Sequence, residues 1–170
     1  MFYVSPGQIN AQLPVSTQLG LATIVVKNGS STSNAAAFTV PETGPGIFTF
    51  QQNGQTRAVV QNPDYSVNAA DNPAKVGDIL VAYFTGGGPV QNKGLGTGTP
   101  APGGLSRVTN SSFVTVANKP AMVTYVGLTP NFVGLYQVNF KVPGVAAGDY
   151  PLILNIGGQA SNAPVITVSN

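Results

Sequence analysis

The sequence predicts an all-β fold, an immunoglobulin-like antiparallel β-sandwich, and three observations lead to this prediction. Apolar residues alternate with a period of two, in short runs that are rich in β-branched and aromatic residues. Gly and Pro, with 21 and 14 residues among 170, bound these runs. No stretch long enough for a helix keeps an apolar stripe without a Gly or a Pro. A chain of this length can bury a core, so we expect it to fold.

The predicted strands recur at the intervals typical of a sandwich. The clearest is 136–142, where Gln137, Asn139 and Lys141 alternate with the residues of one apolar face. The residues of that strand that we expect to face the core are Tyr136, Val138, Phe140 and Val142. The other predicted strands are, in chain order, 22–27, the hairpin of 47–50 with 56–60, 79–84, 113–116 and 121–126. Residues 86–104 hold eight Gly and three Pro, so we expect a long loop there.

An internal repeat organises the chain. Residues 8–14 match 137–143 with three identities in seven, and residues 20–40 match 148–168 with seven identities in 21. The two matches have offsets of 129 and 128 residues. Chance similarity between β-rich segments is the alternative, but a shared Ser-Asn-Ala and a shared Pro favour a duplication. We expect each copy to hold the last three strands of an immunoglobulin-like sandwich.

Only the second copy is preceded by enough predicted strands to complete a sandwich. We therefore expect one complete immunoglobulin-like domain at 75–170, a partial repeat of it at 1–45, and a connecting hairpin at 46–74. A small open sheet with one apolar face is marginal in water. The partial repeat must be covered either by 46–74 or by strands of another subunit, and the second case would be self-association through sheet edges.

Several motifs in combination resemble a known family. They are 3–10 (YVSPGQIN), 44–48 (GPGIF), 72–74 (NPA), 133–139 (VGLYQVN) and 148–151 (GDYP). Together they resemble the repeated C-terminal domain of large secreted proteins from Solibacter-type soil acidobacteria, over nearly the whole chain. The segment from about residue 76 onward also resembles, more loosely, the IPT/TIG immunoglobulin-like fold. The resemblance implies export and an accessory or surface role, and it brings no catalytic residues.

Composition excludes several classes of function. The chain has no Cys and no His, which removes thiolate sites as well as the commonest general base and metal ligand. Seven basic and five acidic residues give a net charge of +2, and the cations form no cluster, so we expect no nucleic-acid partner. No stretch is apolar enough for a membrane span, and the first ten residues, from Met1, do not have the pattern of a signal peptide.

The few candidate catalytic residues are better explained as structural ones. Ser106 lies in the nearest match to a nucleophile elbow, but the second Gly of that motif is missing and no His can serve the serine. Each carboxylate stands beside a turn-forming residue, and we expect Asp78 and Asp149 in particular to be turn residues. The remaining carboxylates are Glu42, Asp64 and Asp71. We predict no enzyme, no catalytic residues and no cofactor.

One loop carries alternating oxygen-bearing side chains, as the start of a calcium-binding loop does. These residues are Asp64, Ser66, Asn68 and Asp71. The sixth and twelfth positions of the calcium pattern, however, hold Ala69 and Lys75 in place of Gly and Glu. Asx-turns are therefore the favoured interpretation and cation binding is the alternative; we assign no metal ligand.

These observations favour a non-catalytic structural or adhesive module, located outside the cell or at its surface. Its expected partners are other proteins or further copies of itself, bound through sheet edges. A carbohydrate-binding module that takes a surface polysaccharide is the alternative, because aromatic rings stack on sugars. The chain has no Trp, and the candidate rings are Tyr65, Tyr125 and Tyr136.

Overall fold

The computed structural model describes residues 2–92 and 94–170, and the strand-only prediction is confirmed there: these residues form strands and no helix. Within the same residues there is accordingly no helix long and apolar enough to cross a membrane. The chain divides into two compact units. Unit 1 comprises residues 2–42 with Gly96–Gly98, and unit 2 comprises Thr43–Leu95 and Thr99–Asn170, of which Lys93 is not described. Each unit is considered separately below.

Unit 2 contains thirteen strands that belong to one sheet. They are β7 (Gly46–Ile47), β8 (Thr49–Gln52), β9 (Gln55–Ala58), β10 (Val60–Gln61), β11 (Ala74–Lys75), β12 (Ile79–Thr85), β13 (Ser106–Arg107), β14 (Ser112–Val116), β15 (Lys119–Leu128), β16 (Tyr136–Lys141), β17 (Gly148–Ile156), β18 (Gln159–Ala160) and β19 (Val165–Ser169). The main path through the sheet is β10-β12-β16-β15-β14-β17-β19-β9-β8, and the other strands pair beside it.

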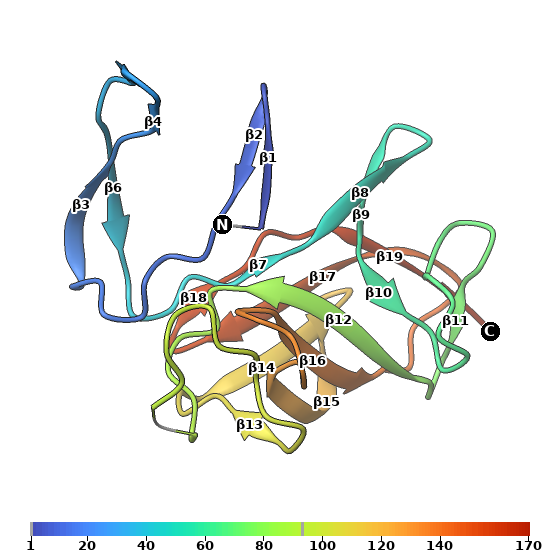
Figure 1. The fold of residues 1–170 in the computed structure, drawn as a ribbon. Coiled ribbons are helices and arrows are strands. Elements are labelled where there is room, and N and C mark those ends of the chain that lie inside the picture. Colours follow the sequence, from blue (N-terminus) through green and yellow to red (C-terminus); the bar gives the residue numbers. More distant parts are fainter. Residues whose placement is uncertain (1, 93) are drawn as a thin grey trace. The chain divides into compact units, whose positions relative to one another are not determined.

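The segment 55–61 joins the two ends of this path, so the sheet nearly closes on itself (Figure 1). Its first part, β9, pairs with β19, where Val165 faces Arg57 in parallel register. Its second part, β10, pairs with β12, where Val60 faces Ala82. Val59 links the two parts and bonds across to both sides, because its N–H donates to Phe48 O and its carbonyl accepts from Tyr83 N. We call residues 55–61 the closing strand.

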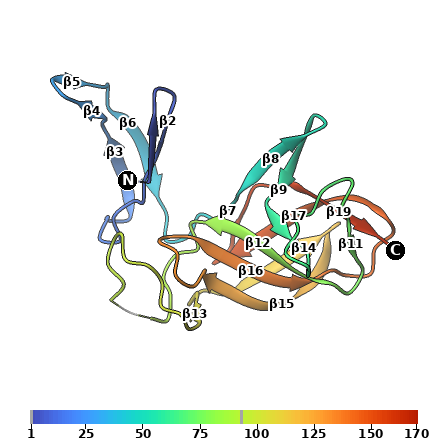
Figure 2. The ribbon, with the colours of Figure 1, turned by 45° about the vertical axis from the view of Figure 1, so that its right-hand side comes forward.

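The core of unit 2 lies inside this nearly closed sheet. Its largest fully buried apolar side chains come from four strands, β12, β16, β17 and β19: Leu80, Phe84, Phe140, Leu152, Leu154, Ile156 and Ile166. The predicted register of the strand at 136–142 is confirmed, because Val138 and Phe140 are fully buried and Lys141 is exposed. Figure 2 shows β12, β16 and β15 side by side, in agreement with their antiparallel pairing.

The glycine-rich segment 86–104 begins with two positions that only glycine fits. Gly86 has a φ of +74°, and a Cβ there would lie 2.0 Å from the carbonyl oxygen of Gly44. A Cβ on Gly87 would lie 2.4 Å from the ring of Tyr136. The main chain runs this close because Gly44 N donates to Gly86 O at 2.9 Å. The first glycines of the segment are therefore packing residues.

The hairpin at 47–60 that the sequence predicts is placed by the structure in unit 2. Strands β8 and β9 pair antiparallel, and Thr49 faces Ala58. The same segment supplies core residues, since Ile47, Ala58 and Val60 are buried. Residues 46–74 therefore share one compact unit and one core with 75–170.

Unit 1 contains three two-stranded pairs and has no buried residue between positions 2 and 42. Strand β1 (Tyr3–Ser5) pairs with β2 (Gln8–Asn10), β3 (Gly20–Ile24) with β6 (Ala36–Val40), and β4 (Lys27–Asn28) with β5 (Ser31–Thr32). Most of its large apolar residues are exposed, from 42% for Val25 up to 83% for Leu21. Unit 1 therefore forms strands without forming a core.

The pairing in unit 1 recurs in unit 2, 128 residues later. Gly20 faces Val40 in β3 and β6, as Gly148 faces Val168 in β17 and β19. The pairs of β4 with β5 recur in the same way in β17 with β18. Side-chain contacts repeat as well: Ser33 Oγ accepts from Val26 N at 3.0 Å, and its counterpart Ser161 Oγ accepts from Leu154 N at 3.0 Å.

Candidate functional site

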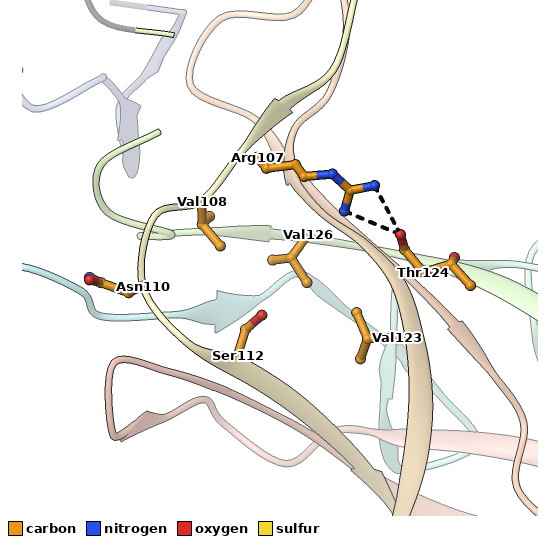
Figure 3. Close-up of a pocket in the computed structure, with 7 residues that line it drawn as sticks. All are labelled: Arg107, Val108, Asn110, Ser112, Val123, Thr124 and Val126. Atoms are coloured by element: carbon orange, nitrogen blue, oxygen red, sulfur yellow. Dashed lines mark hydrogen bonds between the residues drawn. The ribbon is translucent and has the colours of Figure 1, made fainter. Parts of the chain in front are cut away.

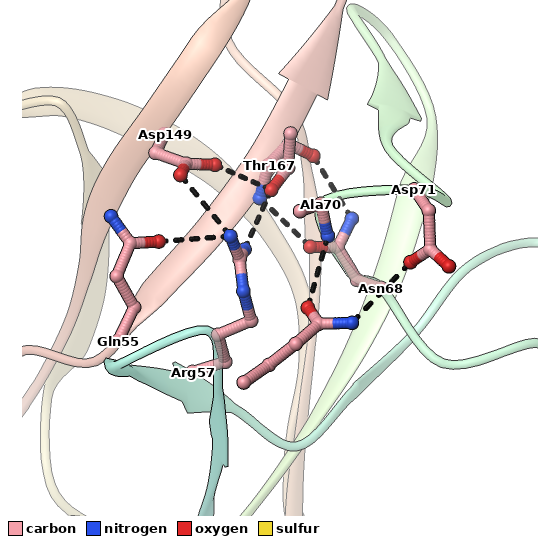
Figure 4. A network of polar contacts seen from close by, with 8 residues as sticks. Gln55, Arg57, Asn68, Ala70, Asp71, Asp149 and Thr167 are labelled. Carbon is pink, nitrogen blue, oxygen red and sulfur yellow. Dashed lines mark hydrogen bonds and ion pairs between the residues drawn. The ribbon is translucent and has the colours of Figure 1, made fainter.

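A buried arginine anchors the closing strand (Figure 4). Arg57 lies in β9 and its side chain is only 2% exposed. Its Nη1 donates to Thr167 Oγ1 at 2.7 Å, and its Nη2 donates to Gln55 Oε1 at 2.9 Å and to Asp149 Oδ2 at 3.1 Å. These bonds tie β9 to β17 and β19, and they neutralise a charge that would otherwise be costly to bury.

Asp149, the carboxylate that pairs with Arg57, is held ionised. The hydroxyl of Thr167 donates to Asp149 Oδ1, and this bond, followed by the bond and charge of Arg57, lowers the pKa of Asp149 from its ordinary value, against the opposing effect of partial burial. The prediction that Asp149 is a turn residue is wrong, because it is the second residue of β17. The polar cluster around Arg57 contains a single carboxylate, that of Asp149, and this carboxylate is already paired with Arg57. The cluster therefore serves as a structural clamp between strands.

The four oxygen-bearing residues of the calcium-like loop do not converge on one point. Asp64 Oδ1 accepts from the N–H and the hydroxyl of Ser66, which is the favoured Asx-turn, and these bonds lower the pKa of Asp64. Asn68 is buried and turns inward, where its amide bonds the main chain of Thr167 in both directions. Asp71 accepts from Gln52 instead. Across residues 2–92 and 94–170, no three acidic residues gather as metal ligands.

The candidate sugar-binding tyrosines do not form one surface. Tyr125 is 5% exposed, and its hydroxyl donates to Leu128 O at 2.7 Å. Tyr136 packs its ring against Phe84 and donates to Gly88 O at 2.6 Å, and burial raises the pKa of its hydroxyl. Tyr65 alone of the three is freely exposed, at 81%. Two of the three predicted rings therefore serve the fold of unit 2.

A shallow polar hollow of about 260 Å³ opens beside β13 and β15 (Figure 3). Arg107, Ser112 and Thr124 contribute polar groups to its lining. The guanidinium of Arg107 is already engaged, because both Nη atoms donate to Thr124 O at 3.2 Å and the group lies 5.1 Å from the centre of the Tyr125 ring. The Asn110 amide points away from the hollow in Figure 3. The hollow offers hydroxyl groups to a ligand but no aromatic platform.

The most distinctive surface of the protein is in unit 1. Ile24 and Val26 are 54% and 43% exposed, and Phe38 and Val40 are half-buried. In strand register Phe38 and Val40 lie on one side of the β3-β6 pair with Ile24. We call Ile24, Val26, Phe38 and Val40 the apolar face. Such an exposed set of apolar side chains on paired strands marks an interaction surface.

The main chain beside this face is also available. Strand β3 pairs with β6 on one side, and among the described residues no strand pairs with the other side of 24–28. We call this side of residues 24–28 the open edge. Unpaired N–H and C=O groups along an edge accept a further strand. Lys27 and Glu42 are the only charged residues between 1 and 42, so few charges oppose such pairing.

No family model matches the chain, and no curated protein matches it either. The functional interpretation therefore depends on the surfaces described above. Sequence reasoning predicted strands in unit 1 and expected them to be covered by 46–74 or by another subunit, but none of residues 2–42 is buried and 46–74 contributes to the core of unit 2. It also missed the Arg57 clamp. The composition gives no signal for that clamp, since an arginine in an alternating strand ordinarily faces solvent.

Proposed function

We propose that the protein is a non-catalytic structural or adhesive module that acts outside the cell or at its surface and contacts other polypeptides through strand edges. The observation that carries this proposal is unit 1, in which paired strands expose an apolar face and an open edge. The absence of His and Cys from the sequence, and the engagement of Asp149 in the clamp, both favour a non-catalytic role.

The finer fold assignment belongs to the same proposal. We propose that unit 2 is an immunoglobulin-like module and that unit 1 is a partial repeat of it. The recurrence of strand pairs at a spacing of 128 residues supports the repeat. The resemblance to secreted acidobacterial domains supports an extracellular location, and it agrees with the low content of charged residues, 7%.

Photo-cross-linking in the producing cells tests the function. A photoreactive amino acid at Val25, beside the open edge, is expected to form adducts with a polypeptide in the extracellular or surface fraction. The same group at Ile153, the counterpart in unit 2 that pairs with Thr115 of β14, is expected to cross-link only within the chain. Adducts confined to the cytoplasm, or no polypeptide adduct at Val25, would contradict the proposal.

A carbohydrate-binding module is the second candidate, favoured by the hydroxyl groups that line the hollow beside Arg107. Polysaccharide pull-down separates the two candidates. Retention that is lost in Ser112→Ala, and kept in a control change at the exposed Phe113, would favour carbohydrate binding. Equal retention of both variants, or none of the parent protein, would leave the protein-binding proposal in place.

A further inference from the structure

We infer that unit 1 binds a β-hairpin that residues 1–170 do not supply, whose first strand pairs with the open edge and whose apolar side chains cover the apolar face. This inference rests on the proposed function, and it names the kind of partner. Strand addition to an exposed sheet edge is a common mode of peptide recognition. The partner can be specified because unit 2 contains the same strands together with their cover.

The first step is the correspondence between the two units. Tyr3 faces Asn10 and Val4 faces Ile9 in unit 1, as Tyr125 faces Asn139 and Val126 faces Val138 in unit 2. Strand β1 thus matches the end of β15, and β2 matches β16. With the matches of β3–β6 to β17–β19, unit 1 corresponds to everything from the end of β15 onward. Counterparts of β14 and of the first half of β15 are missing from it.

The second step is what those missing strands do in unit 2. Strand β14 pairs antiparallel with residues 152–156, and Val114 faces Leu154. The apolar face of unit 1 corresponds to Leu152, Leu154, Ile166 and Val168 of unit 2, which are at most 1% exposed. Apolar residues are thus kept in unit 1 at positions that are fully covered in unit 2. The apolar face of unit 1 is therefore suited to being covered by two strands, in the way that β14 and β15 cover the matching residues of unit 2.

The third step concerns the main-chain groups of the open edge. Val26 N donates to Ser33 Oγ and Val26 O accepts from Ser33 N, so both groups of Val26 point toward β5. Successive residues of a strand direct these groups to opposite sides. The N–H and C=O of Val25 and Lys27 therefore face the open edge. Their counterparts in unit 2 face Thr115 and Phe113 of β14.

The chemistry of the partner follows from this register. The strand opposite 24–28 should be uncharged and should present small β-branched residues opposite Ile24 and Val26, as β14 presents Val116 and Val114 to Leu152 and Leu154. A second copy of this chain does not supply that hairpin, since Val114 and Val116 are fully buried in its own core. The hairpin therefore comes from a polypeptide segment outside residues 1–170.

The test adds a synthetic hairpin of residues 110–128, with a lysine tail for solubility, to the full-length protein. Amide hydrogen exchange is followed by NMR. We expect new protection at the amides of Val25 and Lys27 in unit 1, and no change in the already paired β17 of unit 2. A peptide of the same composition in scrambled order, with the same tail, should give no protection.

Two matched pairs of changes locate the contact. N-methylation of the peptide at the Phe113 position blocks a hydrogen bond to the open edge, whereas N-methylation at the Val114 position does not. On the protein, Val26→Ser should weaken binding about tenfold, because Val26 becomes buried in the complex. Val25→Ser should change binding less than about twofold, since its counterpart Ile153 stays half-buried. The two valines are equally exposed now, at 42% and 43%.

Three results would overturn the inference. One is equal protection by the scrambled peptide, or none by either peptide. Another is protection of Val25 and Lys27 without peptide that grows with protein concentration, because a second copy would then occupy the edge. The third is protection without peptide at every concentration, which would mean that the edge is not open. The first two leave the proposed function standing if Val25 still cross-links to a polypeptide.

Discussion

At the scale of single residues, Arg57 is the least expected member of the core. A buried guanidinium is tolerated when acceptors surround it, and Arg57 has three, from Thr167, Gln55 and Asp149. Its Nε lacks a partner, so the group is well but not completely satisfied. A lysine would place one ammonium where two Nη atoms now reach separate acceptors. The geometry at this site therefore requires arginine.

Replacing Arg57 by methionine should lower the free energy of unfolding by roughly 2–4 kcal/mol, because Asp149 and Thr167 lose a donor inside the sheet. Arg107→Met is the matched control. Arg107 lies at the surface and bonds a carbonyl there, so its loss should cost less than about 1 kcal/mol. Urea unfolding of both variants measures the difference. Equal stability losses would show that Arg57 is not the anchor of the closing strand.

Asp149, which pairs with Arg57, should contribute to the pH dependence of stability, beside the exposed Asp64, whose pKa is also lowered. The pKa of Asp149 in the folded protein lies below the ordinary value of 3.8, so its contribution is fully present above that value and is lost as the pH falls through the folded pKa. Asp149→Asn should therefore be less stable than the parent at pH 7, and the gap should shrink below about pH 4. Since the chain has no His, stability should stay nearly flat from about pH 5 to 8. Urea unfolding across pH 2–8 checks both expectations, and a gap that stays constant down to pH 2 would contradict the first.

Gly87→Ala should destabilise unit 2 by about 1–3 kcal/mol, since the new methyl group would meet the Tyr136 ring at 2.4 Å. Gly103→Ala is the control, because a Cβ there meets nothing within 4 Å. Thermal unfolding of the two variants gives the comparison. A Gly87→Ala protein that melts with the parent would mean that the start of the glycine-rich segment moves aside.

At the scale of elements, strand β16 allows a test of the predicted alternation between buried and exposed residues. Val138→Asp should unfold unit 2, because a carboxylate without a partner would replace a fully buried side chain. Asn139→Asp, one residue along on the other face, should cost less than about 1 kcal/mol. Circular dichroism and urea unfolding distinguish the two outcomes. Similar behaviour of both variants would contradict the register of β16.

The elements also show what sequence reasoning could reach. Alternation predicted the strands at 79–84, 113–116 and 136–142, because a half-buried strand needs a period of two. The similarity between 8–40 and 137–168 predicted strands in unit 1, but the cover that was expected from 46–74 is not found, since none of residues 2–42 is buried. The strand at 56–60 and its hairpin partner were predicted, but its role in closing the sheet was not, because its contacts with β12 and β19 leave no local turn signal. The clamp at Arg57 depends on that closure, so it was missed as well.

At the scale of the whole molecule, the two units differ in how their strands are stabilised. Unit 2 has a continuous core, whereas none of residues 2–42 is buried. Exchange protection follows buried, cooperative structure. We therefore expect the amides of β3 and β6 to exchange much faster than those of β16 and β17, by about a thousandfold or more. Hydrogen exchange of the full-length protein measures this. Equal protection in both units would contradict it.

The closing strand also sets the order in which the molecule can be made. Residues 55–61 leave the ribosome long before 165–169, yet the two segments must meet for the sheet to close. Such pairing between distant segments slows folding. The first strands of unit 2 consequently wait as an unfinished sheet until residues 165–169 have been synthesised. A chain that stops before residue 165 therefore has its closing strand without one of the two neighbours between which that strand lies.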